Sequence, residues 1–225
     1  MNDITHRALL GLIRFQIVLA LLLFLPAWSL HFWQAWIYWS LFFLCTLFIT
    51  LYLLKHDPGL IARRLKVGPG AESEKTQKII QALTAGLVCI MFIVPGFDHR
   101  LHWSTVPTFS VVMADALVLA GFLIIFRVFQ ENSYAASTIQ VEAHQPVIST
   151  GPYRYVRHPM YAGAVLLFLA TPVALGSWWT LLVALVLVGV IVVRLLEEEK
   201  YLAKHLPGYD TYCQKVWYRL IPYVW

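Results

Sequence analysis

The sequence has little charge for its length. Only 13% of its 225 residues are Asp, Glu, Lys or Arg, whereas 60% are hydrophobic. Soluble domains average about 25% charged and about 45–50% apolar residues. This composition therefore excludes an ordinary soluble domain and predicts an integral membrane protein, with a length that fits one domain.

Cysteine is also scarce, and Cys45, Cys89 and Cys213 lie far apart. No Cys-x-x-Cys pair is present, which argues against a disulfide framework and a cysteine-based zinc site. The chain also lacks ligand spacing typical of a metal centre, a nucleophile elbow and a phosphate-binding Gly-rich loop. We therefore expect no metal, and chemistry that uses a bound reagent rather than a covalent enzyme intermediate.

Long hydrophobic runs are what the chain has in abundance. Each of six runs is close to the roughly 20 residues that a membrane-spanning helix needs. They cover residues 8–28, 33–54, 79–97, 107–129, 159–176 and 178–196. The last two are joined only by Gly176 and Ser177, which predicts a C-terminal helical hairpin. We therefore predict an all-α integral membrane protein with about six transmembrane helices.

The basic residues are distributed asymmetrically around these runs. With a cytoplasmic N-terminus, the inner segments are 1–7, 55–78, 130–158 and 197–225. These segments and the inner helix ends hold all of the 17 Lys and Arg residues except Arg100. The positive-inside rule therefore predicts that both termini are cytoplasmic. Because the net charge of +5 comes from residues between hydrophobic runs, we expect no nucleic-acid partner.

Two inner segments carry further local patterns. Asp57 and Pro58 suit the N-cap and first position of a helix. Apolar and basic residues alternate after them, which predicts a short basic amphipathic helix on the inner leaflet. The polar segment 130–150 has apolar residues at intervals, which suggests two short strands with a turn near 143–146.

A polar cluster opens the fifth hydrophobic run. Pro159 suits the first helical position, which places His158 at the N-cap and Arg157 just outside the helix. Free backbone N–H groups and the positive end of the helix dipole then face a ligand. Tyr161 follows on a neighbouring face, and Gly163 permits close approach of a ligand or another helix. Anchoring at the lipid headgroups is the alternative interpretation.

A second polar cluster ends the sixth run. Arg194 precedes Glu197 and Glu198 by three and four residues, so these side chains can pair along the helix. Three consecutive acidic residues at a helix C-terminus oppose the macrodipole, and a cationic partner would explain them. A solvated charge run is the alternative. Because the hairpin returns to the same side, we predict that 151–163 and 194–202 form one cytoplasmic pocket.

These motifs resemble the superfamily of isoprenylcysteine carboxyl methyltransferases and phospholipid methyltransferases, in a prokaryotic form. The resemblance covers about residues 132–225. It rests on Gly151-Pro152-Tyr153, Arg157-His158-Pro159-Met160-Tyr161-Ala162-Gly163, Glu198-Glu199-x-x-Leu202, Leu206-Pro207-Gly208-Tyr209-x-x-Tyr212 and Arg219-Leu220-Ile221-Pro222.

The resemblance implies an S-adenosylmethionine pocket and a bacterial inner-membrane location. It implies one membrane domain, 1–225, with transmembrane helices in 1–129 and a catalytic, cofactor-binding region in 130–225. The cofactor-binding residues would be Tyr153, His158, Pro159, Tyr161, Gly163, Glu199 and Leu202. The catalytic residues would be Arg157, Arg194 and Glu198, with either arginine clamping an anionic substrate head.

The predicted activity is methyl transfer to a lipophilic acceptor that enters from the inner leaflet. A carboxylate acceptor of the isoprenylcysteine type needs no base, whereas an amine or thiol would need His158 or Glu198. An NADPH-dependent reductase of the sterol reductase type is one alternative, but it would need more basic phosphate contacts. A transporter or scaffold is another, but Asp115 is nearly alone as a polar residue within the runs.

Overall fold

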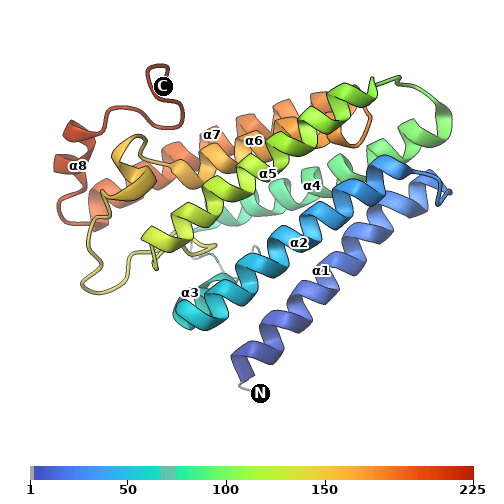
Figure 1. The fold of residues 1–225 in the computed structure, drawn as a ribbon. Coiled ribbons are helices and arrows are strands. Elements are labelled where there is room, and N and C mark those ends of the chain that lie inside the picture. The colour runs from blue at the N-terminus through green and yellow to red at the C-terminus, as the bar shows by residue number, and fades with distance from the viewer. Residues whose placement is uncertain (1–2, 67, 69, 71, 73) are drawn as a thin grey trace.

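The computed structural model describes residues 3–66, 68, 70, 72 and 74–225. Its long elements are all helices (Figure 1): α1 (Asp3–Ala27), α2 (Trp33–His56), α3 (Pro58–Arg64), α4 (Lys75–Leu101), α5 (Thr108–Glu131), η2 (Gly151–Arg154), α6 (Pro159–Ala174), α7 (Thr180–His205) and α8 (Tyr209–Lys215). The all-α prediction is confirmed.

Five of these helices, α1, α2, α4, α5 and α7, are long and apolar enough to cross a membrane. The fifth hydrophobic run forms α6, which has only 16 residues. At 1.5 Å per residue it is about 24 Å long, shorter than the roughly 30 Å hydrocarbon core. The expected hairpin is present, but its first helix ends early because Gly176 adopts a left-handed turn with φ of 72°.

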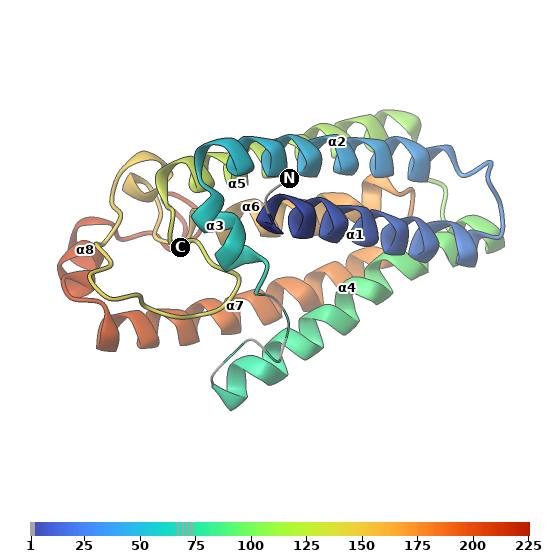
Figure 2. The ribbon, with the colours of Figure 1, turned by 90° about the horizontal axis from the view of Figure 1, so that it is seen from below.

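The long helices form a closed order of neighbours. α1 packs on α2 and α4, α4 packs on α7, α7 on α6, α6 on α5, and α5 on α2. Figures 1 and 2 show α3, η2, α8 and the segment 132–150 gathered at one end of this bundle. We call this the cavity end. Apolar side chains such as Leu44, Phe109 and Leu182 remain exposed along the helices, as expected of lipid-facing surfaces.

The most extensive helix–helix contact in the bundle is between α5 and α6. A Cβ atom added to Gly163 would lie 2.9 Å from Ile125 Cγ1 and 3.0 Å from the Gly121 carbonyl oxygen. A Cβ on Gly121 would lie 2.8 Å from Leu167 Cγ. The two glycines therefore let the helix backbones touch, as small residues do between membrane helices. This contact fixes the direction in which α6 leaves the cavity end.

The opposite end of the bundle is held by a buried carboxylate that sequence patterns did not predict. Asp98, near the end of α4, is only 1% exposed. It accepts hydrogen bonds from Ser177 Oγ at 2.5 Å and from the Ser104 backbone N–H at 2.7 Å. These bonds tie the α6–α7 turn to α4, so both helices of the hairpin reach the cavity end in a fixed register.

The segment 132–150 contains no strand in the part of the chain that the structure describes, so the prediction of two strands is wrong. Its backbone groups bond to side chains instead of to a ladder. The Ala135 carbonyl accepts from Arg64 at 2.9 Å, and the Ile139 N–H donates to Glu72 at 3.2 Å.

Candidate active site

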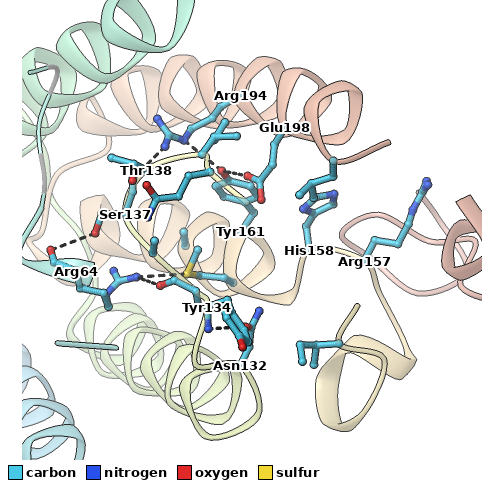
Figure 3. Close-up of a pocket in the computed structure, with 18 of the residues that line it drawn as sticks. Arg64, Asn132, Tyr134, Ser137, Thr138, Arg157, His158, Tyr161, Arg194 and Glu198 are labelled. Carbon is cyan, nitrogen blue, oxygen red and sulfur yellow. Dashed lines mark hydrogen bonds between the residues drawn. The ribbon is translucent and has the colours of Figure 1, made fainter. Parts of the chain in front are cut away.

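The cavity end encloses a cavity of about 490 Å³. That volume is within the range of small-molecule sites. Residues from α3, α4, α5, α6, α7, α8, η2 and the segment 132–148 line it. Figure 3 shows polar side chains from both ends of the sequence converging there. The catalytic region predicted at 130–225 thus forms most of the cavity, but helices of the N-terminal part complete it.

The start of α6 is built as the sequence predicts. His158 is the N-cap and Pro159 is at the first turn. The backbone N–H groups of Arg157 and His158 donate to the carbonyls of Tyr218 and Arg219, at 2.8 and 2.9 Å. The C-terminal tail therefore occupies two of the donors that were expected to face a ligand. These two N–H groups therefore do not face a ligand, because the tail satisfies them within the protein.

Glu199 on α7 is the centre of an ion cluster. Its Oε2 accepts a hydrogen bond from Arg219 Nε at 2.8 Å. Its Oε1 lies 3.2 Å from Arg157 Nε and 3.3 Å from His158 Nε2. The Arg157 contact is an ion pair without hydrogen-bond alignment, since Arg157 Nε has no hydrogen-bond partner. The cationic partner expected for the acidic run is thus inside the protein, and it joins α7, α6 and the tail.

A series of hydrogen bonds between polar side chains runs along the cavity (Figure 3). Tyr161 donates its hydroxyl hydrogen to Glu198 Oε2 at 2.5 Å, and Arg194 Nε donates to the same hydroxyl at 3.2 Å. The other Glu198 oxygen has no hydrogen bond to any residue that the structure describes. Since Glu198 lines the cavity, this oxygen is available to a ligand.

Arg194 extends this series of hydrogen bonds to a residue of the N-terminal half. Its Nη2 donates to Glu72 Oε1 at 2.9 Å and to the Ser137 carbonyl at 3.1 Å. Glu72 is 4% exposed and also accepts from Gln81 at 2.5 Å. A loop carboxylate thereby holds Arg194, α4 and the segment 137–139 together over the cavity.

The structure brings most of the predicted site residues to this cavity. Tyr153, Arg157, His158, Tyr161, Arg194, Glu198 and Leu202 line it. Three others lie outside its lining. Pro159 is buried at the start of α6, Gly163 packs on α5, and Glu199 is held in the ion cluster. Close approach of another helix explains Gly163, so a cofactor contact there lacks the expected geometry.

Several lining or supporting residues were not predicted as site residues. Glu72 lies in the loop before α4 and Gln81 lies on α4, and no sequence motif marks either residue, so only the fold identifies them. Arg219 belongs to the C-terminal motif, but its pairing with Glu199 requires the tail to fold back. Asn132 donates to the Tyr153 hydroxyl at 2.8 Å, which fixes η2 beside the cavity. Arg64 was expected among the basic residues of a short amphipathic helix on the inner leaflet, yet it lines the cavity.

Comparison with known families agrees with this geometry. Residues 109–207 match the sequence model of the family described as phospholipid methyltransferase. The match covers less than half of the chain, from α5 to the turn before α8, and includes both α6 and α7. None of the curated proteins compared with the chain matches it significantly. The match favours a methyltransferase over the reductase and transporter alternatives.

Over residues 109–207 this multi-helix membrane protein therefore matches the phospholipid methyltransferase family, in agreement with the resemblance that its motifs carry.

Proposed function

We propose that this chain transfers the methyl group of S-adenosylmethionine to a lipophilic acceptor drawn from the membrane. The family match supports methyl transfer. The observation that carries the proposal is one cavity with two chemically different walls. Tyr161, Arg194 and Glu198 are among its polar lining residues, which we call the polar wall, and Ile125, Phe168 and Ile191 are among its apolar ones, which we call the apolar wall.

The polar wall suits the methyl donor. When bound, this cosubstrate supplies an electrophilic methyl group on a positively charged sulfur, and it also carries an ammonium group. The free oxygen of Glu198 suits the positive charge of the methyl donor, because a carboxylate in a partly buried site attracts positive charge strongly. The rings of Tyr153 and Tyr161 also line this region and favour cations over their faces.

The residues of the cavity contribute position and electrostatics. Tyr161 and Arg194 hold Glu198 in one orientation, which reduces the entropy lost when reactants are aligned. His158 is held by Glu199, so its ring is oriented at the cavity edge. An amine or thiol acceptor would lose its proton to Glu198 or His158, whereas a carboxylate acceptor needs no base.

The apolar wall suits the acceptor. Besides Ile125, Phe168 and Ile191, it includes Thr84 and Ala85 of α4 and Ala164 of α6. In the ring of helices α4 and α5 are not neighbours, so the cavity lies between elements that do not seal against each other. A hydrocarbon chain can occupy this region while its head reaches Glu198. The charge asymmetry supports a cytoplasmic location for this end of the bundle.

Calorimetric titration with S-adenosylhomocysteine in dodecyl maltoside tests the donor site. We expect saturable binding to the wild type and at least about tenfold weaker binding to Glu198→Gln, since a hydrogen bond to a charged group is lost. Glu197→Gln is the matched control, because Glu197 pairs with Lys200 on the exposed side of α7. Saturable binding of NADPH without binding of S-adenosylhomocysteine would overturn the proposal.

A further inference from the structure

The cavity contains an arginine whose charge no acidic residue balances. Arg64 is the last residue of α3 and lines the cavity. Its Nη1 donates to the Ala135 carbonyl at 2.9 Å and contacts Met160 Sδ at 3.8 Å. Its guanidinium carbon lies 4.5 Å from the centre of the Phe129 ring. Each of these contacts is with a neutral group.

Four other arginines that line the cavity or lie beside it have acidic partners. Arg63 pairs with Glu142 at 2.7 Å, Arg194 pairs with Glu72, and Arg157 and Arg219 pair with Glu199. Among the described residues, no carboxylate lies within ion-pair distance of Arg64. Arg157 and Arg194, predicted to clamp an anionic substrate head, are therefore already neutralised. Arg64 is the cavity cation that remains available to an anion.

An enclosed cation without a counter-charge is energetically unfavourable, because burial removes its hydration. Burial lowers the pKa of Arg64 to about 10. The side chain nevertheless stays protonated at neutral pH, so its positive charge persists. Its remaining exposed surface opens toward the cavity lining. An anion that entered the cavity would restore the balance of charge and gain charge-assisted hydrogen bonds.

The position of Arg64 favours the acceptor over the methyl donor. Arg64 lies outside residues 109–207, the segment that matches the methyltransferase family. A donor site common to that family has to be built mainly within the matched segment. In Figure 3 Arg64 lies on the far side of Tyr161 from His158 and Arg157, near Tyr134 and Ser137. Met160, one of its neutral contacts, also lines the cavity.

We propose that Arg64 forms an anion subsite that binds the negatively charged group of an amphiphilic methyl acceptor. The proposal rests on the proposed methyl transfer and specifies its acceptor. The shared chemistry is a singly charged oxyanion joined to an apolar chain. A phosphodiester of a lipid headgroup and a carboxylate of an alkylated amino acid are its two possible sources. Either would place its chain along the apolar wall.

Native mass spectrometry in dodecyl maltoside tests the subsite. The probes are phosphatidylglycerol for a phosphodiester, N-acetyl-S-farnesylcysteine for a carboxylate, and diacylglycerol as a neutral amphiphile. We expect one anionic probe to bind the wild type in preference to diacylglycerol. Arg64→Gln should weaken that binding about tenfold, as expected for loss of a charge-assisted hydrogen bond. Arg64→Lys should retain part of it, and whichever anionic probe responds identifies the source.

Two controls separate this role from a structural one. Arg63→Gln changes the neighbouring arginine, which pairs with Glu142 and does not line the cavity. It should leave the affinities for all probes unchanged. S-adenosylhomocysteine affinity should be the same in Arg64→Gln and the wild type.

The proposal is overturned if neither anionic probe binds the wild type, or if Arg64→Gln binds them normally. Equal loss of diacylglycerol would indicate damaged packing, and loss of S-adenosylhomocysteine would assign Arg64 to the donor. If instead the wild type fails to bind S-adenosylhomocysteine, the proposed function fails independently of the anion result.

Discussion

Arg219 of the C-terminal tail donates a hydrogen bond to Glu199 at the end of α7, with 2.8 Å between Nε and Oε2. The tail also supplies backbone acceptors to Arg157 and His158. The C-terminal tail therefore packs against the start of α6 and the end of α7 at one side of the site. The ion cluster around Glu199 joins three separate segments. Because Glu199 is the shared partner of the other members, its loss should destabilise the protein more than the loss of any one of them.

Glu199→Gln should destabilise the protein more than Arg219→Ala. The first change leaves Arg157, His158 and Arg219 without their shared counter-charge, at a cost of about 3 kcal/mol. The second removes one of three partners, and Arg219 is partly exposed, so about 1 kcal/mol is expected. Thermal unfolding in detergent measures both. Equal effects would show that Glu199 depends on the tail alone.

Much of the fold follows from the sequence because its causes are local. Hydropathy placed the long helices, and Asp57 caps α3 as predicted, accepting from the Leu60 N–H at 2.8 Å. Pro159 sets the start of α6 at the predicted residue. These features depend on residues within a few positions of each other. The motif resemblance predicted which side chains lie together in the site. Seven of the ten predicted site residues line the cavity.

The remaining features depend on contacts between distant segments. Glu72 reaches Arg194 across 122 positions, and no periodicity signals such a pair. Gly163 has the same sequence context whether it approaches a ligand or a helix, and only the position of Gly121 decides. The sequence places Arg64 on an amphipathic helix at the inner leaflet. In the structure the segment that contains Ala135 covers it. Tertiary placement, which residue type alone does not encode, determines each of these roles.

Tyr161→Phe tests the bridge between Glu198 and Arg194. The ring stays, but the hydroxyl that contacts both groups is lost. We expect S-adenosylhomocysteine affinity or methyl transfer to fall about tenfold, because a hydrogen bond to a charged group is removed. Tyr201→Phe on α7 is the control, since Tyr201 stacks on His205 and does not line the cavity. If affinity and rate are unchanged in Tyr161→Phe, the bridge contributes neither to ligand binding nor to methyl transfer.

Glu72→Ala tests the loop carboxylate behind the cavity. Arg194 would lose its acidic partner, and the Ile139 N–H and Gln81 would lose an acceptor. We expect about 3 kcal/mol of destabilisation, as for a broken buried ion pair. Glu142→Ala removes the partly exposed partner of Arg63 and should cost about 1 kcal/mol or less. Denaturant or thermal unfolding compares the two, and a larger effect at Glu142 would contradict this ranking.

Gly163→Ala tests whether close helix packing, rather than cofactor contact, is the role of this glycine. The added Cβ would meet Ile125 at 2.9 Å and the Gly121 carbonyl at 3.0 Å. Because backbone cannot yield easily, we expect about 1–3 kcal/mol of destabilisation. Gly189→Ala on α7 is the matched control. No atom lies within 4 Å of its added Cβ, so it should be neutral or slightly stabilising. Because Gly163 does not line the cavity, S-adenosylhomocysteine affinity should survive in the folded fraction of Gly163→Ala. Lost affinity with unchanged unfolding temperature would instead assign this glycine to the cofactor site.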